Sequence, residues 1–174
     1  MSASQTQNTE TSLQAEDGMD QYLTFMLAGE EYGLDILRVQ EIKGWNGVTP
    51  MPNMPVYILG VINLRGTIVP VIDLRKRFGL ESIPFDQTTV VIVVKVDDLQ
   101  GGERTMGIVV DAVSEVYSVA QATIKPAPDF GGAISTDSIK GLATLDEKML
   151  ILLDVDHLMN SGVLQALEQE ETAG

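Results

Sequence analysis

The sequence predicts an all-β protein made of two five-stranded barrels around a shared core. The first observation is an internal repeat, in which residues 60–74 (GVINLRGTIVPVIDL) align without a gap on residues 141–155 (GLATLDEKMLILLDV). The repeat extends upstream, where residues 32–42 (YGLDILRVQEI) match residues 106–116 (MGIVVDAVSEV). The second observation is about ten short apolar runs separated by turn residues. Closure into barrels leaves few exposed strand edges, so two barrels are the economical arrangement.

A third pair of segments completes the repeat. Residues 48–53 (VTPMPN) echo residues 124–129 (IKPAPD), and they lie between the two longer matches in both halves. Three matched segments in the same order indicate one structural unit used twice. Two such units related by a pseudo-twofold axis leave a groove between them, and we expect a partner to dock there.

We expect five strands in the first repeat, at residues 21–27, 32–35, 39–45, 60–64 and 67–72. The proline-rich stretch 44–55 is a predicted loop, and residues 55–59 are a predicted helical turn. Pro70 removes a donor from its strand, which predicts an edge strand or a kink. Asp73 is a predicted N-cap for a short helix. The basic run 75–77 in that helix is typical of a solvated face, with attraction of an acidic partner as the alternative.

We expect the second repeat to supply strands within residues 88–96, 104–117, 138–145 and 149–153. The first of these is β-branched and almost entirely apolar, which predicts burial on both faces. The loop over residues 98–104 contains two glycines and is longer than a minimal hairpin. Asp154 or Asp156 begins a terminal helix that includes Leu158 and resumes through Leu164.

Composition divides the chain into three parts. Residues 1–19 are polar and acidic and form a predicted disordered tail. Residues 20–160 form the domain with both barrels and short helices, and residues 161–174 form a predicted helical, acidic tail. Apolar residues make up 44% of the 174 residues, which is typical of a globular protein with a core.

Charge and cysteine content restrict the function classes. The net charge of −14 argues against nucleic acid as a partner, because phosphates require a basic surface. The longest apolar run, residues 90–94, has the length of a strand, and no secretory signal precedes it, so we expect no membrane insertion. The absence of cysteine excludes disulfides and fits a cytoplasmic location.

No constellation of residues indicates catalysis, a metal or a cofactor. His157 is the only histidine, and we expect it at the surface or at a helix cap. Asp154 and Asp156 lack the glycine and the closing glutamate of a calcium loop. The glycines form neither a dinucleotide-binding nor a phosphate-binding motif. We therefore predict a protein that is not an enzyme.

Two features point to interaction instead. Arg65 lies at the turn of the first repeat, where the second repeat has Asp146, and Glu41 corresponds to Glu115. A solvated arginine is one interpretation, and a docking surface oriented by an Arg65–Glu41 pair is the other. Phe130 follows a proline-rich stretch and is either a core residue or an aromatic offered to a partner.

Taken together, these segments closely resemble the CheW family of bacterial chemotaxis coupling proteins. The resemblance runs from about residue 21 to residue 158 and rests on EEYGLDILRVQEI, GVINLRGTIVPVIDLRKRFG, TVVIV, GIVVDAVSEV, IKPAPDF and KMLILLDVDHL. It implies two SH3-like five-stranded barrels around a shared core. It also implies a non-catalytic adaptor that links methyl-accepting chemoreceptors to the regulatory domain of the histidine autokinase CheA, in the cytoplasm beneath receptor arrays.

The resemblance further implies roles for individual residues. It assigns receptor binding to five positions: Val39, Glu41, Gly60, Arg65 and Val90. It assigns kinase binding to Phe130 and Gly141. The related coupling protein CheV is disfavoured, because it adds a receiver domain that is not found here. An adaptor of another chemosensory pathway, such as twitching motility, stays open, and a small β-barrel ligand carrier is the remote alternative.

Overall fold

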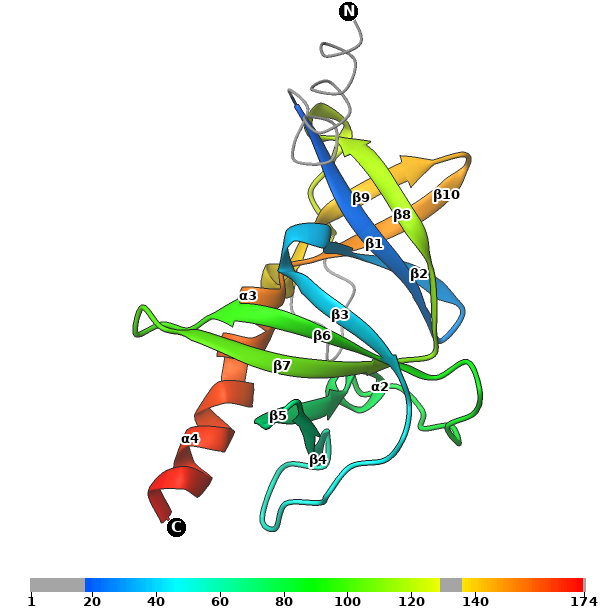
Figure 1. Ribbon diagram of the computed structural model, residues 1–174. Coiled ribbons are helices and arrows are strands. Elements are labelled where there is room, and N and C mark those ends of the chain that lie inside the picture. The colour runs from blue at the N-terminus through cyan, green and yellow to red at the C-terminus, as the bar shows by residue number, and fades with distance from the viewer. Residues whose placement is uncertain (1–17, 129–135, 174) are drawn as a thin grey trace, which may run out of the picture.

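The computed structural model describes residues 18–128 and 136–173, with side chains described up to residue 168. These ranges contain ten strands in two five-stranded sheets, so the predicted all-β class is confirmed (Figure 1). The strands are β1 (Met19–Leu27), β2 (Glu30–Asp35), β3 (Val39–Gly44), β4 (Ile58–Leu64), β5 (Thr67–Asp73), β6 (Val90–Asp97), β7 (Glu103–Val110), β8 (Ala112–Ala120), β9 (Ile139–Leu145) and β10 (Lys148–Leu153).

The two sheets have equivalent strand orders. Sheet A is β8-β1-β2-β10-β9, and sheet B is β3-β6-β7-β5-β4. The sequence repeat pairs β1–β5 with β6–β10 in order, and this pairing converts one sheet order into the other. The parallel junctions agree as well, since β5 aligns Val71 with Gly107 and β10 aligns Leu152 with Gly33. Each sheet combines strands of both repeats, so neither repeat can form a sheet alone.

A core between the sheets connects the two halves. It includes Leu23 and Phe25 of β1, Ile92 and Val94 of β6, and Leu164 after β10. Two smaller clusters of buried apolar residues lie within the individual sheets, one made by strands of sheet B and one by strands of sheet A. Burying large side chains of this kind stabilises a fold by roughly 1.5–3 kcal/mol each. The predicted shared core is therefore confirmed.

Short helices follow the last strand of each repeat, β5 in the first and β10 in the second. Asp73 caps α2 (Leu74–Arg77) by accepting a hydrogen bond from the Arg75 N–H, and Asp154 caps α3 (Val155–Leu158) in the same way through the His157 N–H. The predicted Asp73 cap is confirmed, and of the two aspartates expected to begin the terminal helix, Asp154 is the cap. The chain continues through η4 (Met159–Val163), where Gly162 has a positive φ, into α4 (Leu164–Ala173). The remaining short turns are η1 (Ile36–Arg38), η2 (Gln121–Thr123) and η3 (Thr136–Ser138). No helix in the described ranges has the length and apolar character needed to cross a membrane.

Three local expectations were wrong in part, and for Pro70 the structure excludes the edge strand but does not test the kink. Pro70 is not in an edge strand, because β5 lies between β7 and β4. The pairing of β5 with β7 begins only at Val71, so no hydrogen bond between the strands is lost where Pro70 lacks an N–H. The helical turn at residues 55–59 is a single Ile58 N–H to Pro55 O bond before β4. The basic run is not simply solvated, since Arg75 binds Asp111 and Arg77 donates to the Ser161 carbonyl.

Ion pairs hold the two points where the chain crosses between sheets. Arg38, between β2 and β3, binds Asp156 of α3 at 2.7 Å, and Asp111, between β7 and β8, binds Arg75 of α2 at 2.6 Å. Arg75 and Asp156 occupy equivalent positions in the repeat. The helix therefore supplies the cation in one ion pair and the anion in the other. Asp111 also accepts the Ala28 N–H at 2.9 Å, which attaches the β1–β2 turn to the same crossover.

We predict that Asp111→Asn lowers the free energy of unfolding by about 2 kcal/mol at pH 7, because it leaves a largely buried guanidinium without its charged partner. Burial raises the pKa of Asp111, but hydrogen bonds from Arg75 and the Ala28 N–H outweigh it and hold the pKa below its ordinary value. The contribution of the carboxylate is therefore complete above about pH 4 and is lost as the pH falls through the lowered pKa. Urea unfolding at several pH values measures this.

The control is Glu103→Gln, which removes a surface pair with Lys95 whose two side chains are about half exposed. We expect it to change the unfolding free energy by less than about 0.5 kcal/mol. A wild-type advantage over Asp111→Asn that grows below pH 4 would contradict the assignment.

Candidate functional site

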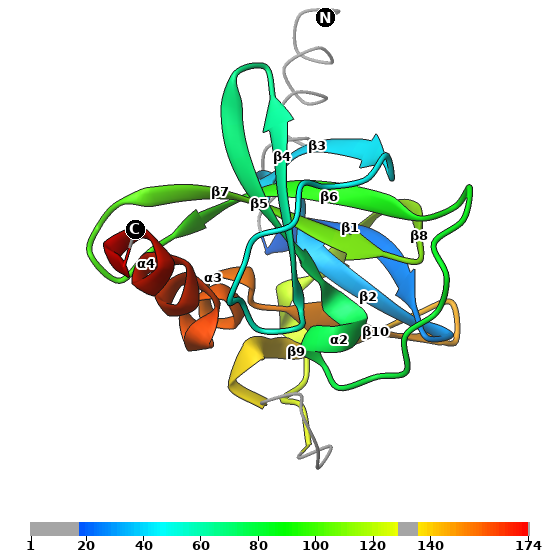
Figure 2. The ribbon, with the colours of Figure 1, turned by 90° about the horizontal axis from the view of Figure 1, so that it is seen from below.

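The turn between β4 and β5 presents Arg65 to solvent. Arg65 and Gly66 form a two-residue turn with φ values of 51° and 88°, and this turn stands out from the body of the molecule (Figure 2). Such turns favour asparagine, aspartate or glycine at both positions, so an arginine goes against the local preference. Its side chain is 70% exposed, and one guanidinium nitrogen donates to the Glu41 carboxylate of β3. The structure thus brings Arg65 and Glu41 together.

The pair spans the gap between the two edges of sheet B. Glu41 belongs to the edge strand β3, and Arg65 follows the other edge strand, β4. The hydrogen bond from Arg65 lowers the pKa of the Glu41 carboxyl, and the nearby Lys43 lowers it further. Glu41 is therefore ionised at neutral pH and keeps the guanidinium in a defined position on an exposed turn.

The equivalent end of sheet A has different chemistry. Asp146 and Glu147 form its turn, also with positive φ values, so the backbone is the same as at Arg65 and Gly66. Glu115, the counterpart of Glu41, accepts a hydrogen bond from the Tyr117 hydroxyl, which raises the pKa of Tyr117 to about 12. The arginine occurs at only one of two matched turns. Its presence therefore does not follow from the needs of the fold.

Val39 and Val90 lie on the face of sheet B that meets sheet A. Both are half-buried and pack against the core between the sheets. The same face carries Ile42, which aligns with Ile92 and is 43% exposed. Its counterpart in the repeat, Val116 of β8, is 46% exposed. Two matched apolar side chains on the edge strands therefore remain available to a partner.

Sequence reasoning missed Ile42 and Val116 as site residues. Both close the matched segments YGLDILRVQEI and MGIVVDAVSEV, so their equivalence was visible in the sequence. An apolar residue in a strand is usually read as core, and only the edge position of β3 and β8 reveals the exposure.

Gly60 and Gly141 are buried positions in β4 and β9. A Cβ on Gly60, whose φ is 150°, would lie 2.1 Å from the Thr49 carbonyl oxygen. A Cβ on Gly141 would lie 2.4 Å from a methyl carbon of Ile124. In each half the glycine admits a crossing segment, which pairs Thr49 with Val61 in one half and Lys125 with Leu142 in the other. A role of the two glycines in partner binding stays a prediction. Such a role would be indirect, because each glycine allows a crossing segment to lie close to its strand and so shapes the nearby surface.

The remaining sequence candidates are placed as follows. Phe130 lies outside the described residues. His157 is the third residue of α3, and its Nδ1 lies 2.9 Å from the Ser138 hydroxyl. The Asp154 carboxylate accepts from the His157 backbone N–H, which commits it to the helix cap. Within the described residues, no group of three or more His, Cys, Asp or Glu side chains is arranged to hold a metal ion.

We predict that Gly60→Ala destabilises the protein by about 3 kcal/mol, because the added methyl group meets a backbone oxygen and the φ value disfavours an L-residue. Gly66→Ala is the matched control, since its φ is also positive but no atom lies within 4 Å of the added Cβ. That control should cost about 1 kcal/mol. Equal losses for the two variants in urea unfolding would show that the close approach of Thr49 is unimportant.

Comparison with known proteins agrees with this geometry. Residues 21–163 match the CheW-like domain family. The chemotaxis protein CheW of Klebsiella aerogenes is 47% identical over 153 residues, which cover 88% of this chain and 89% of that protein. The chemotaxis protein CheW of Rhizobium meliloti is 33% identical, with coverage of 83% and 90%.

A solved structure supports the fold independently. The scaffolding protein TtCheW from Thermoanaerobacter tengcongensis superposes with a TM-score of 0.72 at 36% identity, covering 83% of this chain and 92% of that chain. The family match over residues 21–163 includes strands of both sheets and the turn that carries Arg65. By sequence and by fold, the chain belongs to the CheW-like family.

Proposed function

We propose that the chain is an adaptor of bacterial chemotaxis that couples membrane chemoreceptors to the histidine kinase CheA. The observation that carries the proposal is the family match over residues 21–163, with 47% identity to a chemotaxis CheW protein. The similar solved structure is that of a scaffolding protein, which supports a role without catalysis. We place the adaptor in the cytoplasm, beside receptor arrays.

An adaptor without chemistry controls a kinase through binding alone. It must bind the active and inactive arrangements of the kinase and receptor unequally, because a partner with equal affinity for both shifts nothing. Interfaces of micromolar affinity correspond to about 8 kcal/mol each. Several such contacts in one assembly strengthen one another through effective concentration.

The receptor is proposed to contact the surface of sheet B around Arg65. The Arg65–Glu41 pair offers an oriented cation, and the half-buried Val39 and Val90 lie along the same sheet. Ile42 and its counterpart Val116 add apolar contact area on the two edge strands. Exposed apolar residues and oriented charges are both typical of protein interfaces. Kinase contact through Phe130 and through the surface shaped by Gly141 completes the proposal.

The three-part division of the chain is kept as part of the proposal. Residues 20–160 are proposed as the domain that carries the two barrels, and residues 1–19 as a tail outside them, although Met19 is the first residue of β1 and pairs with Ala120. Residues 161–174 are proposed as a helical, acidic end. Leu164 and Leu167 of α4 are buried against the core, which attaches the start of this end to the domain.

Binding of the wild-type protein to a CheA regulatory domain and to a receptor cytoplasmic fragment tests the function. We predict that Arg65→Glu weakens receptor or kinase association at least tenfold while the unfolding transition is unchanged, because the exposed guanidinium contributes to docking and not to the core. Pull-down and calorimetric titration measure the affinity, and circular dichroism checks the fold.

Lys148→Glu is the matched control, because it makes the same charge change on the exposed hairpin of sheet A. It should leave the interaction that depends on Arg65 intact. Full affinity of Arg65→Glu for both partners, or its unfolding at ordinary temperature, would contradict the docking role. Failure of the wild type to bind either partner would contradict the adaptor function itself.

A further inference from the structure

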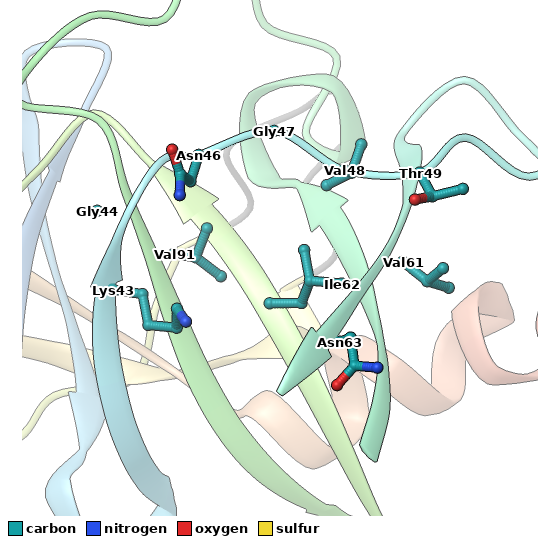
Figure 3. Close-up of a pocket in the computed structure, with 10 residues that line it drawn as sticks. All are labelled: Lys43, Gly44, Asn46, Gly47, Val48, Thr49, Val61, Ile62, Asn63 and Val91. Carbon is teal, nitrogen blue, oxygen red and sulfur yellow. The ribbon is translucent and has the colours of Figure 1, made fainter. Parts of the chain in front are cut away.

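A pocket of about 380 Å³ lies between β3 and β4, the two edge strands of sheet B. Lys43 of β3 and Asn63 of β4 lie on opposite sides of it, and Ile62 and Val91 lie between them (Figure 3). The segment that contains Asn46 and Thr49 borders the pocket at one end. Apolar side chains therefore form the floor of the pocket, and polar side chains form its sides.

Among the described residues, no strand of either sheet pairs with the outer edge of β3 or of β4. The Thr49 N–H donates to Val61 O at 2.9 Å and the Val61 N–H donates to Thr49 O at 2.8 Å, so the outer edge of β4 already accepts an extended segment. Backbone direction alternates along a strand, so the N–H and C=O of Asn63 point to the same outer side. The Trp45 N–H donates to Thr89 O on the β6 side of β3, which turns the N–H and C=O of Gly44 outward.

The pocket has one charged group. Lys43 is half-buried, and among the described residues no carboxylate lies within ion-pair distance of its ammonium group. Glu41 already accepts a hydrogen bond from Arg65, which lowers the pKa of Glu41, and the positive charge of Lys43 lowers that pKa further. A lysine above an apolar floor complements a carboxylate locally.

We propose that this pocket binds an extended, acidic peptide segment of a partner protein, which adds a strand between β3 and β4. Backbone hydrogen bonds to Asn63 and Gly44 would align the segment, as in other cases of strand addition. A carboxylate of the segment would reach Lys43, and an apolar side chain would cover Val91. The existing Thr49–Val61 pairing is continued by such a strand.

This site is distinct from the surface around Ile42. Consecutive side chains of a strand point to opposite faces, so Lys43 and Ile42 lie on different sides of β3. Glu41 lies two residues before Lys43 and on the same face, so the pocket adjoins the Arg65–Glu41 pair without including either residue.

The proposal goes beyond the adaptor function, because the peptide test is read at Gly44 and Asn63 and does not depend on the outcome for Arg65→Glu. Trp45, the single tryptophan of the chain, is adjacent to Gly44 and Asn46 and reports on this pocket.

The test uses the full chain and two synthetic probes, acetyl-Val-Thr-Glu-Thr-Val-amide, in which the Glu and both Val side chains share one face, and the same peptide with Gln in place of Glu. Titration is followed by Trp45 fluorescence and by amide NMR. We expect shifts at the Gly44 and Asn63 amides, and roughly tenfold tighter binding of the Glu peptide, the factor given by about 1.4 kcal/mol from a charge-assisted hydrogen bond. Lys43→Met should remove the preference for the Glu peptide, and Lys148→Met, on the exposed hairpin of sheet A, should keep it.

Three results would overturn the proposal. The first is the absence of shifts at Gly44 and Asn63 at millimolar peptide. The second is equal affinity of the wild type for the two peptides. The third is an equal loss of affinity for both peptides in Lys43→Met, which would mean that the lysine acts through packing and not through its charge.

Discussion

The exchange of strands between the two repeats is the constraint on which the rest of the structure depends. Sheet A takes β1 and β2 from the first repeat and three strands from the second, and sheet B reverses this. The chain must therefore cross between the sheets twice, at Arg38 and at Asp111, and each crossing is tied to a helix by an ion pair. Because each sheet contains strands of both repeats, the core between the sheets forms only when both repeats are present.

Much of this fold was predictable because the repeat is visible in the sequence. The alignment of residues 60–74 with 141–155 identified equivalent strands, and the two aspartates that follow them were recognisable as helix caps. The exchange was not predictable, because a strand has the same apolar pattern in either sheet. Pro70 shows the same limit: its missing donor restricts only one side of β5, and the sequence does not say when the neighbouring strand begins.

Site residues were predictable from the sequence where the two repeats differ in residue type, and they were not predictable where the repeats agree. Arg65 stood out because its counterpart is Asp146, and the structure joins it to Glu41 as the repeat suggested. Ile42 and Val116 match each other and resemble core residues, so their exposure depended on knowing the strand order. Gly60 was assigned by resemblance, and the physical reason for a glycine there is the carbonyl of Thr49, a contact that no local pattern reveals.

A pseudo-symmetric fold with unequal surfaces suits an adaptor for a physical reason. Identical ends would bind the same partner twice and would make two different partners compete. Here the backbone of the two hairpin turns is the same, with positive φ at both positions, but one turn carries Arg65 and the other Asp146 and Glu147. Charges of opposite sign at equivalent places reject the wrong partner through repulsion as well as attracting the right one. One repeated unit can therefore present two distinct docking ends while a single shared core holds both in a fixed relation.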